Sequence, residues 1–542
     1  MMEENPVNTN PLYLGFDLST QSIKAVVTNE SLEVLYEASV NFDKDLPEFR
    51  TTGGVNKDER NSKIVSAQPI MWIKALDIVM EKIRLLEFPI DTIVGISGAG
   101  QQHGSVYWRR GAQKMLQTLD SGKFLHDQLA FAFSVTHSPV WMDSSTTEYC
   151  DKLEKFVGGP EELAKITGSK AYERFTGSQI SKIFNTKREA YNSTERISLV
   201  SSFICSVFLG DYAGIDYSDG SGMNLLDIRT KTWDAKCLEG ATSNDSNLEE
   251  KLGIPIPSEL VVGTVSNYFV ERYGFSPDCK VVAFTGDNPS SFAAMALGPN
   301  DIAVSLGTSD TVFLSLDSLP EEGLGEGHIF ANPVSSKERY MALLCFKNGS
   351  LTRERIRRDA ADRSWKIFNE LLNSTPRGNF GNIGIYYDLW EIIPKVKNGD
   401  HRFNKEGSRL NKFTSKEVEV RALIEGQFLS RRIHAERIGC KITKESKILA
   451  TGGASCNEDI LQVLSDVFNA PVYVQDTSSS ADLGACYRIK HAFAEEGSSY
   501  TEVVGNKASF KKVCDPNRDA KEIYDTMAKR FEVLEKSIVQ GP

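Results

Sequence analysis

The chain has 542 residues, of which 40% are hydrophobic and 25% are charged, and its formal net charge is −11. At about 100–200 residues per domain, this length indicates roughly two to four domains and excludes a peptide, a disulfide mini-scaffold or a lone binding module. A protein whose main partner is nucleic acid usually carries a basic surplus, so the acidic balance argues against that class of partner.

The cysteines and the N-terminal residues indicate the cellular compartment in which the chain is expected. The nine cysteines are odd in number and form no C-x-x-C pair, which favours reduced thiols over a disulfide framework or a cysteine zinc site. Residues 1–11 are predicted to be a disordered tail, and their acidic, polar start lacks the chemistry of a secretory or mitochondrial leader. The longest apolar stretch, 197–209, is shorter than the roughly 20 residues that span a bilayer. We therefore expect a cytoplasmic chain without a membrane partner.

Short apolar runs separated by polar turns open the chain. Strands are predicted at 12–16, 23–28 and 32–42, and the tight turns between them indicate a meander. Apolar residues recur every three or four positions from 69 to 86, which predicts an amphipathic helix. A buried strand at 93–97 and helical segments near 146–157 and 177–191 follow.

The same succession begins again near residue 280. Strands are predicted at 280–285, 302–306, 311–316, 339–346, 447–451 and 472–475, and helices at 290–297, 351–372, 418–438, 458–468 and 481–494. The second meander again has a polar first turn, and alternating helices and strands again follow it. The pattern indicates a duplicated α/β domain with a cleft between the halves, and clefts between domains are where ligands usually bind.

Each predicted meander has a hydroxyl-rich first turn. The first contains Asp17, Ser19, Thr20 and Gln21, and the second contains Gly307, Thr308 and Ser309. Such turns can direct several N–H groups and hydroxyls at one phosphate, and Asp17 can hold Mg²⁺, which prefers oxygen ligands. Two matched turns across a cleft would bind consecutive phosphates of one nucleotide. The alternative for each is an ordinary hairpin turn.

Two strand ends in the second half also have the chemistry of a site. Gly452 and Gly453 precede a helix starting near Asn457, where a ligand can approach the backbone and the helix N-terminus favours negative charge. A plain structural junction is the alternative. Asp287 ends the predicted strand 280–285 and can accept a proton from an attacking hydroxyl. Its alternative role is to cap the helix that follows Pro289.

Other patterns argue against rival functions. Residues 98–104 resemble a dinucleotide fingerprint, but His103 stands where the third glycine is required, which disfavours a dehydrogenase that binds NAD. No P-loop motif occurs. The arginines between 353 and 358 suggest RNA contact, but an apolar stripe runs through the same segment, so a solvated helix face is the better interpretation.

Together these motifs resemble those of the FGGY carbohydrate kinases, within the sugar kinase–actin–heat-shock ATPase superfamily. Segments 16–21, 305–309 and 451–455 match the two phosphate motifs and the adenosine motif, in the expected order over about residues 12–495. Segments 102–104 and 285–289 look most like those of xylulose kinases of the animal type.

The resemblance implies a fold and an activity. The fold is α/β, with duplicated ribonuclease-H-like (actin-like ATPase) domains: 12–286 for sugar binding and the first phosphate motif, and 287–542 for ATP and the general base. The activity is phosphorylation of D-xylulose by ATP with Mg²⁺, with the nucleotide between the two lobes, in a monomer or homodimer. Alternatives are another FGGY substrate, such as ribulose, glycerol or gluconate, and a non-catalytic ATPase of the actin or chaperone type.

The resemblance also implies residue roles. Asp287 is the general base, and the open-chain ketose is bound by His103, Arg174, Asp287 and Asn288. Asp17 and Asp287 are the carboxylates near Mg²⁺. ATP is bound by Asp17, Ser19, Thr20, Gln21, Gly307, Thr308, Ser309, Trp365, Gly452, Gly453 and Asn457.

Overall fold

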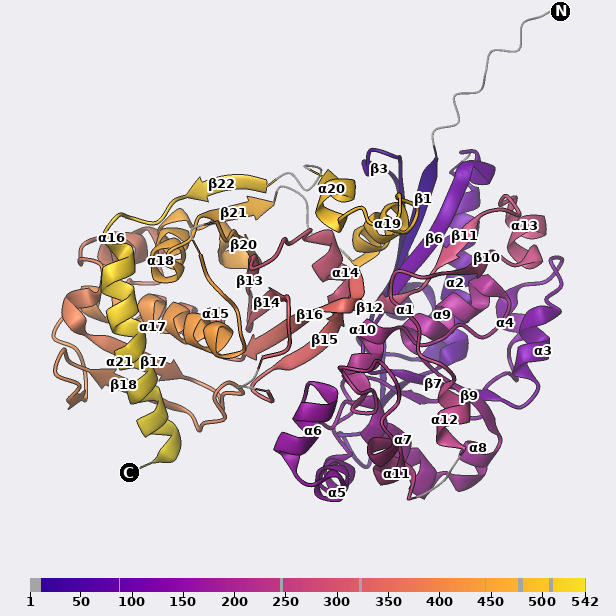
Figure 1. Cartoon of the computed structure of the whole chain (residues 1–542), viewed down its shortest axis with the longest axis horizontal. Helices are drawn as coiled ribbons and strands as arrows, with labels where there is room; N and C mark the ends of the chain where they lie inside the picture. Colours follow the sequence, from indigo (N-terminus) through magenta and orange to yellow (C-terminus); the bar gives the residue numbers. More distant parts are fainter. Residues whose placement is uncertain are drawn as a thin grey trace, which may run out of the picture. The chain divides into compact units, whose positions relative to one another are not determined.

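A computed structural model describes residues 11–86, 88–243, 247–320, 324–443, 445–475, 481–505 and 510–541. The predicted tail, 1–11, lies outside these residues except for Pro11. The contacts divide the chain into two units (Figure 1). The first comprises Met1–Ala296, Phe330–Arg339 and Ser479–Lys507, and the second comprises Leu297–Ile329, Tyr340–Ser478 and Ala508–Pro542. The boundary predicted between 286 and 287 falls inside the first unit's longest segment.

The first unit contains a sheet whose centre is the predicted meander. The strand order is β10 (Val261–Thr264), β11 (Lys280–Val282), β6 (Ile93–Gly100), β1 (Leu12–Leu18), β2 (Ser22–Thr28) and β3 (Val34–Asn41), and β12 (Thr285–Gly286) also pairs with β6. The pairs β3–β2 and β2–β1 are antiparallel, β1–β6 and β6–β11 are parallel, and β11–β10 is antiparallel.

Helices cover both faces of this sheet, so β1 is buried along its whole length. Successive side chains of a strand point to opposite faces. Accordingly, Leu14 and Phe16 join the core made with α2 (Pro69–Arg84) and α9 (Val200–Leu209), whereas Tyr13 packs with α19 (Ala481–Ala492). At Gly15 a Cβ atom would lie 2.1 Å from the backbone oxygen of Asp482, so only glycine lets α19 approach β1 this closely.

The second unit repeats the order of pairing. Its sheet runs β15 (His328–Asn332), β16 (Ser335–Phe346), β14 (Asp310–Leu316), β13 (Ile302–Leu306), β20 (Ile448–Thr451), β21 (Val472–Gln475) and β22 (Phe510–Cys514). From β16 onward the pairs are antiparallel, antiparallel, parallel, parallel and antiparallel, as they are from β3 to β10. The predicted duplicated α/β fold is confirmed.

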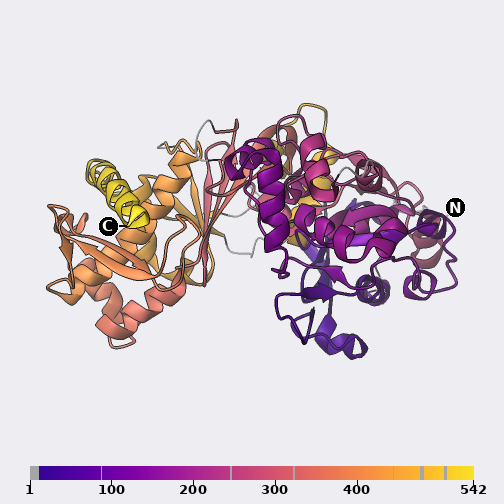
Figure 2. The same ribbon diagram turned by 90° about the horizontal axis from the view of Figure 1, so that it is seen from below.

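The second unit also contains a helical layer and a small sheet. Helix α17 (Lys416–Arg437) packs against α16 (Trp365–Asn373), α18 (Glu458–Phe468) and the C-terminal α21 (Ala520–Gln540), which Figures 1 and 2 draw in yellow. Strands β17 (Ile383–Tyr387), β18 (Gly399–Phe403) and β19 (Arg409–Leu410) form the small sheet, in a region where no elements were predicted. Throughout the described ranges, helices that combine the length and the apolar composition of a membrane span are absent.

The remaining elements are short and belong to the first unit. They are α1 (Phe42–Asp45), β4 (Asn56–Lys57), β5 (Val65–Ala67), β7 (Ser105–Arg109), α3 (Ala112–Gln117), α4 (Leu125–Gln128), β8 (Ser138–Pro139), α5 (Thr147–Val157), α6 (Pro160–Thr167), α7 (Thr176–Thr186), α8 (Arg188–Asn192), β9 (Thr194–Leu199), α10 (Tyr217–Gly220), α11 (Ala235–Thr242), α12 (Leu248–Leu252), α13 (Asn267–Tyr273), α14 (Asp287–Ala294) and α20 (Tyr500–Val504).

Three element predictions were wrong. The helical segment expected near 177–191 is two helices, α7 and α8. The helix expected over 351–372 is two helices, α15 (Ser350–Ala360) and α16, because Asp362 and Arg363 have φ values of 47° and 62°. Such left-handed residues end a right-handed helix. The strand expected over 280–285 is divided between β11 and β12.

Candidate active site

The first polar turn places a buried carboxylate at the end of β1. Asp17 is only 9% exposed, and its Oδ2 accepts a hydrogen bond from Ser19 Oγ at 2.5 Å. Its Oδ1 has no hydrogen-bond partner among the residues that the structure describes. The pKa of Asp17 is raised to about 7, mainly by burial and also by the negative charges of Asp287 and Asp482, while the hydrogen bond from Ser19 and the charge of Lys24 act in the opposite direction. A buried carboxylate with an unsatisfied oxygen suits a bound cation.

The hydroxyls of this turn are held by backbone and side-chain contacts. Ser19 donates its backbone N–H to the Ser22 carbonyl at 2.9 Å, while Gln21 is exposed. The indole N–H of Trp141 donates to Thr20 Oγ1 at 2.9 Å. This positioning contact was not predicted, because the two residues are 121 positions apart.

Asp287 is the first residue of α14, whose N-cap is Gly286. The helix therefore begins three residues earlier than expected, and Asp287 does not cap a helix starting after Pro289. Its Oδ1 accepts hydrogen bonds from the backbone N–H of Asn288 at 2.8 Å and from the Asn288 side chain at 3.1 Å. Burial raises the pKa of Asp287 to about 6, although these hydrogen bonds and one from the Gln102 backbone lower it.

Gln102 connects the Asp287–Asn288 pair to the loop after β6. Its Oε1 accepts a hydrogen bond from Asn288 Nδ2 at 2.9 Å, and its Nε2 donates to Asp219 Oδ1 at 3.4 Å. Asp219 also accepts a 2.6 Å hydrogen bond from Ser201 Oγ. The side chain of Asn288 is thereby oriented by a chain of buried polar groups, which no local sequence pattern predicted.

His103 lies in the same loop as Gln102 and has a φ of 69°, in the left-handed region. Its Nδ1 is 3.0 Å from the Gly222 carbonyl oxygen, and its ring stacks on Phe175 at 4.6 Å between centroids. Burial lowers the pKa of His103 to about 3, and the charge of Arg174 contributes in the same direction. Because a carbonyl only accepts, neutral His103 carries its proton on Nδ1, which leaves Nε2 to accept a hydrogen bond from a hydroxyl.

Arg174 approaches this group over the aromatic ring that His103 stacks on. Its guanidinium lies 5.9 Å from the Phe175 ring centroid and 5.3 Å from that of Tyr172. The first unit therefore brings together His103, Arg174, Asp287 and Asn288, and the charge of Asp287 also acts on Asp17.

The second polar turn follows β13 and is held from beneath by buried charges. The carbonyl of Gly307 accepts a hydrogen bond from the backbone N–H of Ser350 at 2.8 Å, and Thr308 is exposed. Asp310, directly after the turn, is fully buried and accepts two hydrogen bonds from Arg353, at 2.8 and 3.0 Å, and one from Arg431 at 3.0 Å. The expectation that the arginines of this helix form a solvated face is wrong for Arg353, which is 0% exposed.

Three of the four predicted adenosine residues, Gly452, Gly453 and Asn457, follow the carboxyl end of β20. Gly452 has a φ of 81°, and a Cβ atom there would lie 2.8 Å from the Leu306 backbone oxygen, whereas Gly453 faces open space. Asn457 caps α18 by accepting from the Ile460 N–H, and its side chain donates to Asn369 of α16 at 3.0 Å. Trp365 begins α16, with the Arg357 guanidinium 4.7 Å from its ring centroid.

The glycines of the fingerprint-like segment have packing roles. Gly98 and Gly100 lie within β6, where a Cβ atom would come within 2.4 Å of the Phe284 ring and 2.5 Å of the Ser201 backbone nitrogen, respectively. In the part of the chain that the structure covers, no group of three or more His, Cys, Asp or Glu side chains is arranged to hold a metal ion.

Comparison with known families agrees with this fold and these motifs. The models of the FGGY family of carbohydrate kinases match the chain over residues 133–295 for the N-terminal domain and 302–492 for the C-terminal domain. The chain belongs to this family of carbohydrate kinases.

Comparison with individual proteins gives a more specific likeness than the family models do. The chain is 53% identical to the xylulose kinase of Rattus norvegicus over 533 residues, covering 98% of both chains. It is 48% identical to xylulose kinase 2 of Arabidopsis thaliana, over 89% of this chain and 87% of the relative. The crystal structure of xylulose kinase from Rhodospirillum rubrum matches with a TM-score of 0.77 at 15% identity, over 97% of this chain and 98% of that one, and supports the fold.

Proposed function

We propose that this carbohydrate kinase transfers the γ-phosphoryl group of ATP to D-xylulose, giving D-xylulose 5-phosphate and ADP. The observation that carries the proposal is the 53% identity with the rat xylulose kinase over 98% of both chains. The four residues predicted to bind the sugar all lie within the first unit; they are His103, Arg174, Asp287 and Asn288.

Asp287 is the general base of the proposed reaction. The sugar O5 attacks the γ-phosphorus, the bond between that phosphorus and the bridging oxygen breaks, and the hydroxyl proton passes to the Asp287 carboxylate. A pKa near 6 leaves this carboxylate mostly ionised at neutral pH and still basic enough to take the proton. Because phosphoryl transfer has a loose transition state, the main contribution of the protein is positioning and charge stabilisation.

The ketose is oriented by groups that contact the same loop. His103 accepts a hydroxyl hydrogen at Nε2, since its Nδ1 is committed to the Gly222 carbonyl. Asn288 is held by Gln102, and Arg174 donates to sugar oxygens. The proposed division of roles between residues 12–286 and 287–542 changes in one respect, because Asp287 acts from the unit that contains the sugar residues.

The nucleotide is proposed to contact both hydroxyl turns. Ser19, Thr20 and Gln21, and likewise Gly307, Thr308 and Ser309, bind phosphate oxygens. Gly452, Gly453, Asn457 and Trp365 surround the adenosine. The residues fit Mg²⁺, because Asp17 Oδ1 is buried without a hydrogen-bond partner in the described part of the chain and the Asp287 charge acts on the same group. Asp17 and Asp287 would hold the ion, which neutralises phosphate charge when bound.

A sugar panel tests the substrate. ADP release is measured with D-xylulose, D-ribulose, glycerol and gluconate, with and without Mg²⁺, and we expect the highest kcat/KM for D-xylulose and no turnover without the metal. A higher kcat/KM for another acceptor would assign a different FGGY specificity.

A variant tests the base. Asp287→Ala should lower kcat by about 10²–10⁴-fold, the usual contribution of general acid–base catalysis, while ATP still binds in a nucleotide titration. Near-normal turnover of this variant would remove Asp287 from the mechanism.

A further inference from the structure

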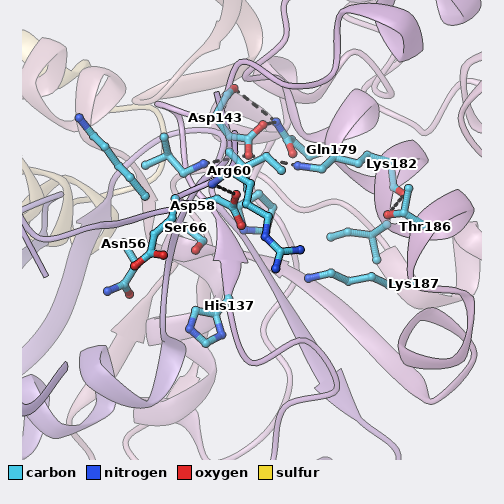
Figure 3. A pocket seen from close by; sticks show the side chains of 16 residues that line it. Asn56, Asp58, Arg60, Ser66, His137, Asp143, Gln179, Lys182, Thr186 and Lys187 are labelled. Atoms are coloured by element: carbon cyan, nitrogen blue, oxygen red, sulfur yellow. Dashed lines mark hydrogen bonds and ion pairs between the residues drawn. The ribbon is translucent and has the colours of Figure 1, made fainter. Parts of the chain in front are cut away.

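A cavity of about 550 Å³ lies in the first unit, away from the residues assigned above (Figure 3). It is enclosed by the β4–β5 hairpin, by the segment around β8, and by α7 with the residue that follows it. Ser66 of β5 pairs with Pro139 of β8, which joins two of these walls. None of the predicted sugar, nucleotide or metal residues lines it.

Cationic side chains dominate this cavity. Lys57, Arg60, Lys182 and Lys187 line it together with His137. Figure 3 shows the Arg60 guanidinium and the Lys187 ammonium pointing into the opening from different walls. In the described ranges, neither Arg60 nor Lys187 has an ion-pair partner. Lys57 likewise forms no ion pair within these ranges, so three lining cations are available to a ligand, of which Arg60 and Lys187 point into the opening.

Three carboxylates, those of Asp58, Glu59 and Asp143, also line the cavity, so its four cations exceed its acidic groups by one positive charge. Asp143 is 1% exposed and is neutralised by Lys182 at 3.2 Å, while it also accepts from Ser145 Oγ and Gln179 Nε2. Asp58 Oδ1 accepts the backbone N–H groups of Arg60 and Asn61, both at 2.9 Å.

The pKa shifts of the cationic side chains also indicate a cavity that favours an anion. Partial desolvation and the charge of Lys182 lower the pKa of Lys187, and partial desolvation and the charge of Lys187 lower the pKa of His137. These groups therefore repel one another in the empty cavity, and a bound anion would relieve the repulsion.

Size and wall chemistry define the rest of the ligand. A volume of 550 Å³ lies within the range of small-molecule sites and exceeds the need of a phosphate group alone. Ile64, Val65 and Ile183 supply apolar wall, and Asn56 and Ser66 supply polar groups that can bond hydroxyls.

We propose that this cavity binds a phosphate monoester of a small polyhydroxylated molecule, a sugar phosphate. Arg60 and Lys187 hold the phosphate group through charge-assisted hydrogen bonds, and Asn56 and Ser66 contact the hydroxyls. The proposal does not depend on which sugar the enzyme phosphorylates, since none of these residues belongs to the proposed reaction.

The test compares two double variants of the full chain. Arg60→Ala/Lys187→Ala removes the two cations that point into the opening, and Lys155→Ala/Lys236→Ala removes two exposed lysines that do not line the cavity. Calorimetric titration with D-ribose 5-phosphate should show binding that the first variant weakens about tenfold or more and the second leaves unchanged. Both should unfold at the wild-type temperature, because all four side chains are exposed.

A local measurement excludes binding elsewhere. The rate of amine labelling at Lys187, followed by mass spectrometry, should fall several-fold with D-ribose 5-phosphate and stay constant with D-ribose, while Lys155 is labelled at a constant rate. Equal protection by inorganic phosphate would overturn the sugar part of the assignment. Equal affinity in the two double variants, or no protection of Lys187, would overturn the site. Turnover of D-xylulose by wild type is measured separately, so failure of the proposed function is distinguishable.

Discussion

The buried charges beneath the second polar turn allow a specific test of how that turn is held. Arg353→Met keeps the length and apolar stem of the side chain but removes both hydrogen bonds to Asp310 and the 3.0 Å hydrogen bond to Gln427. Asp310 then keeps only Arg431. Because Asp310 and Arg353 are both 0% exposed, water cannot replace the lost partner.

The expected loss of stability follows from the burial of this ion pair. Removing one partner of a buried ion pair usually costs about 3–5 kcal/mol. Since Arg431 still compensates part of the Asp310 charge, we expect the lower end, about 3 kcal/mol. At about 2–4 °C per kcal/mol for a unit of this size, the melting temperature should fall by roughly 6–12 °C. The turn should also loosen, so the KM for ATP should rise more than the KM for the sugar.

The assay is thermal unfolding combined with steady-state kinetics. Arg358→Met is the matched control, because Arg358 lies on the same helix but is 54% exposed and pairs only with its neighbour Asp359. Arg353→Lys should not restore stability, because an ammonium cannot form the two parallel hydrogen bonds. If Arg353→Met and Arg358→Met unfolded at the same temperature, the buried pair would not stabilise the turn, and this reasoning would be refuted.

Three further outcomes are expected. Activity should fall as the pH drops below about 6, where protonation of Asp287 removes the base; a pH–rate profile flat through this range would contradict that role. Asp17→Asn should raise the melting temperature by a few degrees more at about pH 8 than at about pH 5, because the folded-state pKa of Asp17 is raised and stability is lost as pH rises toward 7; an equal difference at both pH values would argue against a buried charge. Gly222→Ala should raise the KM for the sugar about tenfold with little change for ATP, since a Cβ atom there would lie 3.0 Å from the His103 ring, which Phe175 prevents from moving away; an unchanged sugar KM would remove His103 from substrate binding.

The elements that the sequence predicted well are those with a local signal. The first meander, the helix after residue 69 and the elements between residues 447 and 494 were expected from apolar periodicity or strand composition, and their bounds in the structure differ by few residues. The elements that follow, α20, β22 and α21, were not predicted. The hydroxyl turns could be found because turn residues and strand ends are adjacent in the chain. Family motifs then supplied the roles of Asp287, Gly452 and Trp365, which remain predictions.

The contacts that orient the site have no local signal. The carbonyl that fixes the tautomer of His103 is 119 positions away, and the Asn288–Gln102 bond spans 186 positions. Arg353 shows the same limit, since its helix has both an apolar stripe and a run of arginines. Only the position of Asp310, 43 residues earlier in the chain, determines that this arginine is buried and its neighbour Arg358 is not.

The two duplicated hairpins differ in how their carboxylates are satisfied. In the first, Asp17 has one bond from Ser19 and an unsatisfied Oδ1, and its pKa is raised. In the second, Asp310 forms ion pairs with Arg353 and Arg431, and its charge serves to hold the turn in place. Charge is therefore available to a ligand or cation at the first hairpin, while the second presents backbone and hydroxyl groups. It follows that Asp17→Asn should lower turnover without lowering the melting temperature, and that Asp310→Asn should lower the melting temperature more than turnover. The opposite result, measured by melting temperature and kcat on the same samples, would mean that the hairpins have kept equivalent roles.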